Sequence, residues 1–151
     1  MSPTDYLALA IAKAREGIRA GQMPYGAVVV LDGNVLACEH NIVRAAGDPS
    51  AHAEVTAIRK ASLAIGTHDL TGCEVYTTCE PCLMCFGACF WAGAASIVYG
   101  AAITDKATFG INDPGVRSES LRELSKSPVK ITGGVLREEC LELFRLFTSR
   151  R

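Results

Sequence analysis

The chain has 151 residues, of which 49% are hydrophobic and 21% charged, and its formal net charge is −1. This length and apolar content fit one domain spanning residues 1–151, and no apolar run is long enough to cross a membrane. The near-neutral charge excludes a globally basic surface for nucleic acid, and the opening residues lack the charged start of a signal peptide, so we expect a cytoplasmic protein.

The first third of the chain predicts a helix followed by a β-hairpin. Apolar residues recur at helical spacing over residues 4–20, and Gly21 ends the pattern. The apolar stretch 26–31 predicts a strand. Turn residues 32–34 separate it from a second strand, 35–39, so we expect the two strands to pair antiparallel.

The middle of the chain predicts two strands alternating with two helices. A helix is expected over 49–65, because Asp48 can cap it and proline suits its first position. Strands are expected over 73–78 and 95–100, with a helix over 81–93 between them. Such a strand–helix–strand order predicts a right-handed parallel crossover.

The last third predicts shorter elements: a loop over 101–117, a helix over 118–126, a strand over 129–132 and a closing amphipathic helix around 140–147. Taken together, the elements predict an α/β fold of three layers, α/β/α, in which helices cover both faces of a mixed sheet.

Four cysteines fall within one short stretch of the chain: Cys79, Cys82, Cys85 and Cys89. Their spacing matches the C-x2-C-x2-C-x3-C run of bacterial iron–sulfur proteins. Phe90 stands where that run has proline, and no second run exists, so we keep an iron–sulfur cluster as the weaker interpretation. The total of seven cysteines is odd, which argues against a complete disulfide framework and for metal binding or catalysis.

A second interpretation uses only Cys82 and Cys85. They share one face of the helix expected over 81–93 and lie in its first turn, where the helix dipole favours thiolates. A catalytic zinc takes three protein ligands and keeps a fourth position for water. A closed structural zinc with Cys79 as a fourth ligand, and a redox-active CxxC pair, are the alternatives.

The third ligand is expected to be one of the three histidines, His40, His52 and His68. Only His52 has a carboxylate two residues away, Glu54, and both lie near the start of a predicted helix. With Pro81 and the two cysteines, this gives the H-x-E … P-C-x-x-C arrangement of zinc nucleobase deaminases.

The chemistry of such a site follows from its donor set. A zinc ion with three protein ligands lowers the pKa of its bound water to about 7. Glu54 is the candidate to take the proton from that water and to deliver it to the ring and to the departing amine. Without the motif, Glu54 would be interpreted as a carboxylate on the helix surface.

The segments AHAEVTAIRKA (51–61) and TTCEPCLMCFGACFWAG (77–93) resemble the cytidine deaminase-like superfamily, and bacterial guanine deaminases in particular. PYGAVVVLDG (24–33) and EHN (39–41) are similar too. The resemblance implies a five-stranded mixed sheet and a homodimer. It also implies that His52, Cys82 and Cys85 bind zinc. Glu54 would be the proton shuttle.

The resemblance also implies four substrate contacts. Asn41 would hydrogen-bond the base edge, Trp91 would form an aromatic wall, and Tyr25 stands where the family often has phenylalanine. Asp113 matches a carboxylate that guanine deaminases use near the base. Trp91 could instead belong to the core, Tyr25 could pack at an edge, and Asp113 could shape the turn before Pro114.

Two departures bear on the substrate. Ile111 and Asn112 differ from the family pattern beside Asp113, and residues 131–147 resemble the C-terminal part of bacterial tRNA adenosine deaminases. We expect hydrolysis of guanine to xanthine and ammonia. Another free base, a nucleoside, an aminotriazine and adenosine in tRNA remain alternatives.

Overall fold

The structure, a computed structural model, describes residues 1–150. The strands are β1 (Gly26–Leu31), β2 (Asn34–His40), β3 (Glu74–Cys79), β4 (Ser96–Ala101) and β5 (Lys130–Thr132). The helices are α1 (Pro3–Arg19), α2 (Val43–Ala46), α3 (Ala53–Ile65), α4 (Leu83–Ala92), α5 (Ser118–Ser125) and α6 (Arg137–Thr148), with a 3-10 helix, η1, at Ile103–Phe109. None of the helices within 1–150 is long and apolar enough to cross a membrane.

The five strands form one mixed sheet in the order β2-β1-β3-β4-β5. β1 pairs antiparallel with β2 and with β3, whereas β3, β4 and β5 run parallel. This confirms the predicted hairpin and the parallel arrangement of the two strands that flank α4. Because Gly26 pairs with His40 and Ala27 pairs with Thr77, the start of β1 and the ends of β2 and β3 meet at one edge of the sheet.

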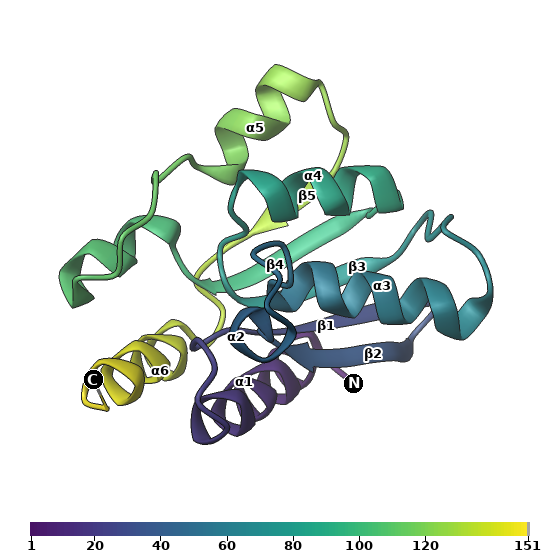
Figure 1. Ribbon diagram of the computed structural model, residues 1–151. Helices are drawn as coiled ribbons and strands as arrows, with labels where there is room; N and C mark the ends of the chain where they lie inside the picture. The colour runs from purple at the N-terminus through teal and green to yellow at the C-terminus, as the bar shows by residue number, and fades with distance from the viewer. Residues whose placement is uncertain (151) are drawn as a thin grey trace.

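Helices cover both faces of the sheet, as the sequence predicts (Figure 1). α1 and α6 lie on one face, and α3 and α4 lie on the other. Successive residues of β1 alternate between the two cores: Val28 and Val30 belong to the α1/α6 side, and Ala27 and Val29 to the α3/α4 side. α1 approaches the sheet so closely that a Cβ at Gly26 would clash with the carbonyl oxygen of Ala10.

Helices α3 and α4 begin later in the chain than predicted. Asp48 shapes a turn instead of capping a helix, because its carboxylate accepts hydrogen bonds from the amide and hydroxyl of Ser50. α3 therefore begins at Ala53 with His52 as its N-cap residue. α4 begins at Leu83, with Cys82 as its N-cap residue, two residues after Pro81.

The C-terminal third also differs from the expectation. The segment predicted as a loop, 101–117, contains η1, and α6 begins at Arg137, before Cys140. The short helix over 118–126 and the last strand are found where the sequence places them.

Candidate functional site

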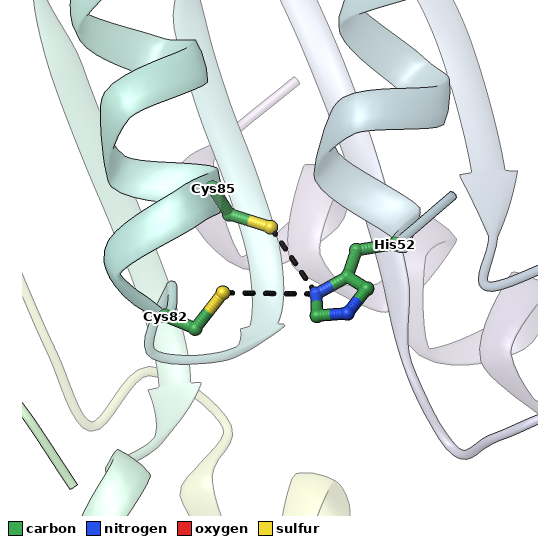
Figure 2. Close-up of side chains that lie close together, drawn as sticks. All are labelled: His52, Cys82 and Cys85. Carbon is green, nitrogen blue, oxygen red and sulfur yellow. Dashed lines mark hydrogen bonds between the residues drawn. The ribbon is translucent and has the colours of Figure 1, made fainter. Parts of the chain in front are cut away.

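Three side chains converge where α3 and α4 begin (Figure 2). The Nδ1 atom of His52 lies 3.7 Å from Sγ of Cys82 and 3.5 Å from Sγ of Cys85. All three ligand atoms lie within 4.8 Å of one another. Zinc bonds of about 2.3 Å to sulfur and 2.0–2.1 Å to nitrogen in a tetrahedron separate a sulfur from a nitrogen by about 3.6 Å. The donor set and its spacing therefore fit one zinc ion held by three protein ligands.

The electrostatics of the cluster favour a cation. The pKa of Cys82 is lowered to about 4, chiefly by a hydrogen bond from the Cys85 thiol and further by His52, against the opposing effect of burial. The pKa of Cys85 is raised because its thiol donates that bond and because it is buried. Cys82 is therefore the thiol that loses its proton more readily, and a bound cation would stabilise both thiolates.

Glu54 lies in the first turn of α3, beside the ligand cluster, and is only 6% exposed. The hydroxyl of Thr77, on β3, donates to its Oε1 atom at 2.9 Å. Within residues 1–150, no hydrogen bond reaches Oε2. One oxygen is therefore held in place while the other keeps its lone pairs for a proton, as a shuttle requires.

Asn41 and Tyr25 lie at the same edge of the sheet. Asn41 follows β2 and is buried, with its backbone amide donating to the carbonyl of Tyr25 and its Oδ1 accepting from the amide of Val43. Tyr25 precedes β1 and packs edge-on against Phe144 of α6, at 6.1 Å between ring centres. The structure thus brings both predicted residues to the edge where α3 and α4 begin.

Asp113 is not a free carboxylate. Its Oδ2 lies 2.7 Å from Nζ of Lys106, and its Oδ1 accepts from the backbone amide of Gly115 at 3.0 Å. Lys106 in turn lies with its ammonium 4.9 Å from the centre of the Tyr25 ring. Sequence reasoning missed Lys106, because the residue carries no motif and lies in a segment that was predicted as a loop.

Glu80 is a second residue that the sequence did not single out. It is buried beside the zinc motif, and its Oε2 accepts from the amide of Ile103 at 2.9 Å. Its Oε1 accepts from the amide of Ser118 at 2.8 Å and from Nε of Arg117 at 3.0 Å. Glu80 therefore fastens both ends of the segment that carries Lys106 and Asp113.

Trp91 does not reach the site in this chain, contrary to the expected aromatic wall. It lies at the end of α4, is 81% exposed and touches the neighbouring ring of Phe90 at 5.4 Å between centres. With Ile58 and His68 it borders a shallow hollow on the outer surface of α3 and α4. α4 is apolar on all sides, so its sequence does not show which face is buried.

The four clustered cysteines do not form one site. Cys79 is buried in the core on the α1/α6 side of the sheet, and Cys89 in the core on the α3/α4 side. Burial raises the pKa of both thiols, which keeps them neutral. Of the residues that the structure describes, only His52, Cys82 and Cys85 could hold a metal together. The iron–sulfur interpretation and the four-ligand structural zinc were therefore wrong.

Comparison with known proteins agrees with this geometry. Residues 2–101 match the family described as the cytidine and deoxycytidylate deaminase zinc-binding region. Guanine deaminase of Bacillus subtilis is 45% identical over 120 residues, which cover 79% of this chain and 77% of that protein. The tRNA-specific adenosine deaminase of Agrobacterium fabrum is 36% identical over 144 residues, covering 95% and 92% respectively.

The crystal structure of a mutant protein in complex with 8-azaguanine has the same fold, with a TM-score of 0.90 and 28% sequence identity. The match covers 99% of this chain and 86% of that chain. The matched family region includes the segments that supply the histidine and the two cysteines. The chain therefore belongs to the cytidine and deoxycytidylate deaminase family, as a deaminase with a His/Cys/Cys zinc-binding site that resembles guanine deaminase.

Proposed function

We propose that this enzyme hydrolyses guanine to xanthine and ammonia. The observation that carries the proposal is the position of the Glu54 carboxylate, held by Thr77 beside His52, Cys82 and Cys85. The identity of 45% with a guanine deaminase supports this substrate, as does the similarity to a protein that binds 8-azaguanine.

The reaction joins the oxygen of water to C2 of guanine and breaks the bond from C2 to the amino nitrogen. His52, Cys82 and Cys85 would hold a zinc ion, which when bound would supply the acidity that lets water ionise near neutral pH. The Oε2 atom of Glu54 takes a proton from the water and transfers it to the ring nitrogen beside C2. A second proton passes through the same carboxylate to the amino group, which leaves as ammonia.

The edge of the sheet supplies candidate base contacts. The amide of Asn41 is fixed through its oxygen by Val43, which leaves its nitrogen to donate to the base. The ring of Tyr25 would border the base, and Asp113 would face its polar edge.

We further propose a homodimer formed through the outer surface of α3, α4 and α5. Exposed large apolar side chains gather on these helices: Leu63, Leu83, Phe90, Trp91 and Leu124. A surface of this kind is typical of a subunit interface. Sedimentation of the wild type and of Trp91→Glu tests the proposal. A wild-type monomer would refute it, and dissociation of the variant would support it.

Deamination of adenosine in tRNA is the second candidate. The similarity to a tRNA-specific adenosine deaminase spans 95% of this chain, whereas the similarity to guanine deaminase spans 79%. A tRNA enzyme would show strong salt dependence of substrate binding, because each phosphate contact releases counterions.

A cytoplasmic location remains a prediction, which cell fractionation would test.

The experiment that tests the substrate is ammonia release by the zinc-loaded protein across guanine, guanosine, cytosine, an aminotriazine and tRNA. Guanine should give a kcat/KM at least tenfold above each of the others, on the order expected when a pocket is built for one base. Faster turnover of any other substrate would refute the assignment to guanine, and Glu54→Gln serves as the inactive control.

A further inference from the structure

A hollow of about 530 Å³ lies where α1 and α6 end beside α2. α1 and α6 lie side by side on one face of the sheet (Figure 1). The residues that border the hollow come from these three helices and from the segments that follow α1 and α6. None of them is a zinc ligand, the proton shuttle or a proposed base contact. The hollow is therefore distinct from the zinc cluster, and its size is typical of sites for small molecules.

Three arginines border this hollow: Arg19, Arg44 and Arg150. The Nη1 atom of Arg44 donates to the carbonyl of Gly21, and that of Arg150 donates to the carbonyl of Ile18, both at 3.0 Å. A guanidinium has five N–H donors, so each of these two keeps four. Binding the carbonyls at the end of α1 is an ordinary role for arginine, but it accounts for only one donor of each and does not involve Arg19.

The positive charge of the hollow is not neutralised by carboxylates. Within residues 1–150, none of the three arginines takes part in an ion pair. Glu16, one turn before Arg19 on α1, lies 3.0 Å from Lys13 instead. The C-terminal end of a helix carries only about half a negative charge, against three formal positive charges here. The hollow is therefore suited to an anion.

Gln22 adds an uncharged donor to the hollow. It is only 7% exposed and borders the hollow directly. Its Oε1 atom accepts from the backbone amide of Ala45, in α2, at 3.3 Å, which assigns the oxygen to that contact and leaves the side-chain nitrogen for another partner. In the part of the chain that the structure describes, that nitrogen makes no hydrogen bond. A buried donor without a partner costs free energy, so Gln22 points to a ligand with acceptor oxygens.

We propose that this hollow binds the phosphate group of a small molecule, with Arg19, Arg44 and Arg150 as charged donors and Gln22 as a neutral donor. Guanidinium groups match phosphate oxygens in pairs, and a phosphate has enough oxygens to accept from several of them at once. A net charge of −1 and a confined hollow favour a small ligand over a nucleic-acid backbone, which a broad basic surface would bind. The proposal does not depend on which base the zinc site deaminates.

Calorimetry of the zinc-loaded protein with inorganic phosphate tests the site. The wild type should bind phosphate with a Kd of about 1 mM or lower at moderate salt. Arg44→Gln should weaken binding by about tenfold or more, as expected for the loss of a charged hydrogen bond. Arg59→Gln, at an exposed position on α3, is the matched control and should leave the Kd unchanged. A wild type without saturable binding would overturn the proposal. So would an unchanged Kd in Arg44→Gln, because the phosphate would then be bound elsewhere, for example by the zinc.

Gln22→Glu tests the hollow without removing an arginine. The new side chain has nearly the same shape and keeps an acceptor for the amide of Ala45, but it replaces the donor group by an anionic oxygen. Thermal unfolding should show a folded protein, and the affinity for phosphate should fall by more than about tenfold. An unchanged affinity would show that the anion does not enter the hollow, and would overturn the proposal.

Three further ligands identify the source of the phosphate. If guanosine 5′-monophosphate binds more tightly than inorganic phosphate and Arg44→Gln removes the difference, the ligand is a nucleotide; otherwise equal or weaker binding identifies free phosphate. Guanosine lacks the phosphate and should lose no affinity in Arg44→Gln, whereas losses equal to those of the nucleotide would overturn the proposal. Displacement of phosphate by tRNA, with tRNA affinity lost in the same variant, would assign the hollow to nucleic acid and overturn the assignment to a small molecule.

Discussion

Replacing Glu80 by glutamine should destabilise the protein strongly, although the two side chains have nearly the same shape. The glutamine oxygen can keep the bonds from Ser118 and Arg117, but its amide nitrogen would face the backbone N–H of Ile103. A buried donor left unpaired costs about 1–3 kcal/mol, and each remaining bond loses about 1 kcal/mol when its acceptor loses its charge. The expected loss is therefore about 3–5 kcal/mol.

Urea unfolding of the zinc-loaded protein measures this loss. With a slope of about 2 kcal/mol per molar urea, the midpoint should fall by about 1.5–2.5 M. Glu119→Gln is the matched control: Glu119 is 42% exposed and lies 3.8 Å from the same arginine, so its loss should cost well under about 1 kcal/mol. If Glu80→Gln moved the midpoint no further than Glu119→Gln, the view that Glu80 holds the segment would be wrong.

Three further perturbations test the site and the fold. Glu54→Gln should keep zinc, measured by metal analysis, but lose about 10²- to 10⁴-fold in ammonia release, and normal turnover would end the proton-shuttle assignment. Because the pKa of Cys82 in the metal-free protein is about 4, well below its ordinary value, the thiolate contributes stability fully above pH 9, and this contribution fades as pH falls toward 4. Thiolate absorbance against pH checks this, and a midpoint near 9 would contradict it. Gly26→Ala should lower the urea midpoint by an amount equal to at least about 1–3 kcal/mol, because its methyl group would meet the carbonyl of Ala10, and an unchanged midpoint would refute that close approach.

The sequence predicts best those helices and strands whose conformation depends on the residues within the element itself. β1 reads as an apolar run bounded by a turn, and it forms the predicted hairpin with β2. The three ligands were predictable because zinc chemistry restricts both residue type and spacing, so the motif carries the information that the fold would otherwise have to supply. Figure 2 shows the result.

What the sequence could not supply depends on contacts between distant segments. Asp48 and Pro49 satisfy the local rules for a helix start, yet the carboxylate binds Ser50 and forms a turn. Lys106 meets Asp113 only because η1 and the following residues fold back, and nothing local marks that pairing. The exposure of Trp91 follows from the orientation of α4, whose apolar residues surround the helix axis and give no preferred face.

His52 and Cys82 each occupy the N-cap position of a helix, and neither side chain makes the hydrogen bond that usually closes a helix start. In isolation, helices of 13 and 10 residues would be marginal in water, and here packing supplies the stability that the first turns do not gain from a capping bond. One ion bound between them would fix both starting points at once, although they are 30 positions apart in the chain. Chelation should therefore loosen the first turns of both helices together, so that amide exchange there rises in concert while β1 and β3 stay protected.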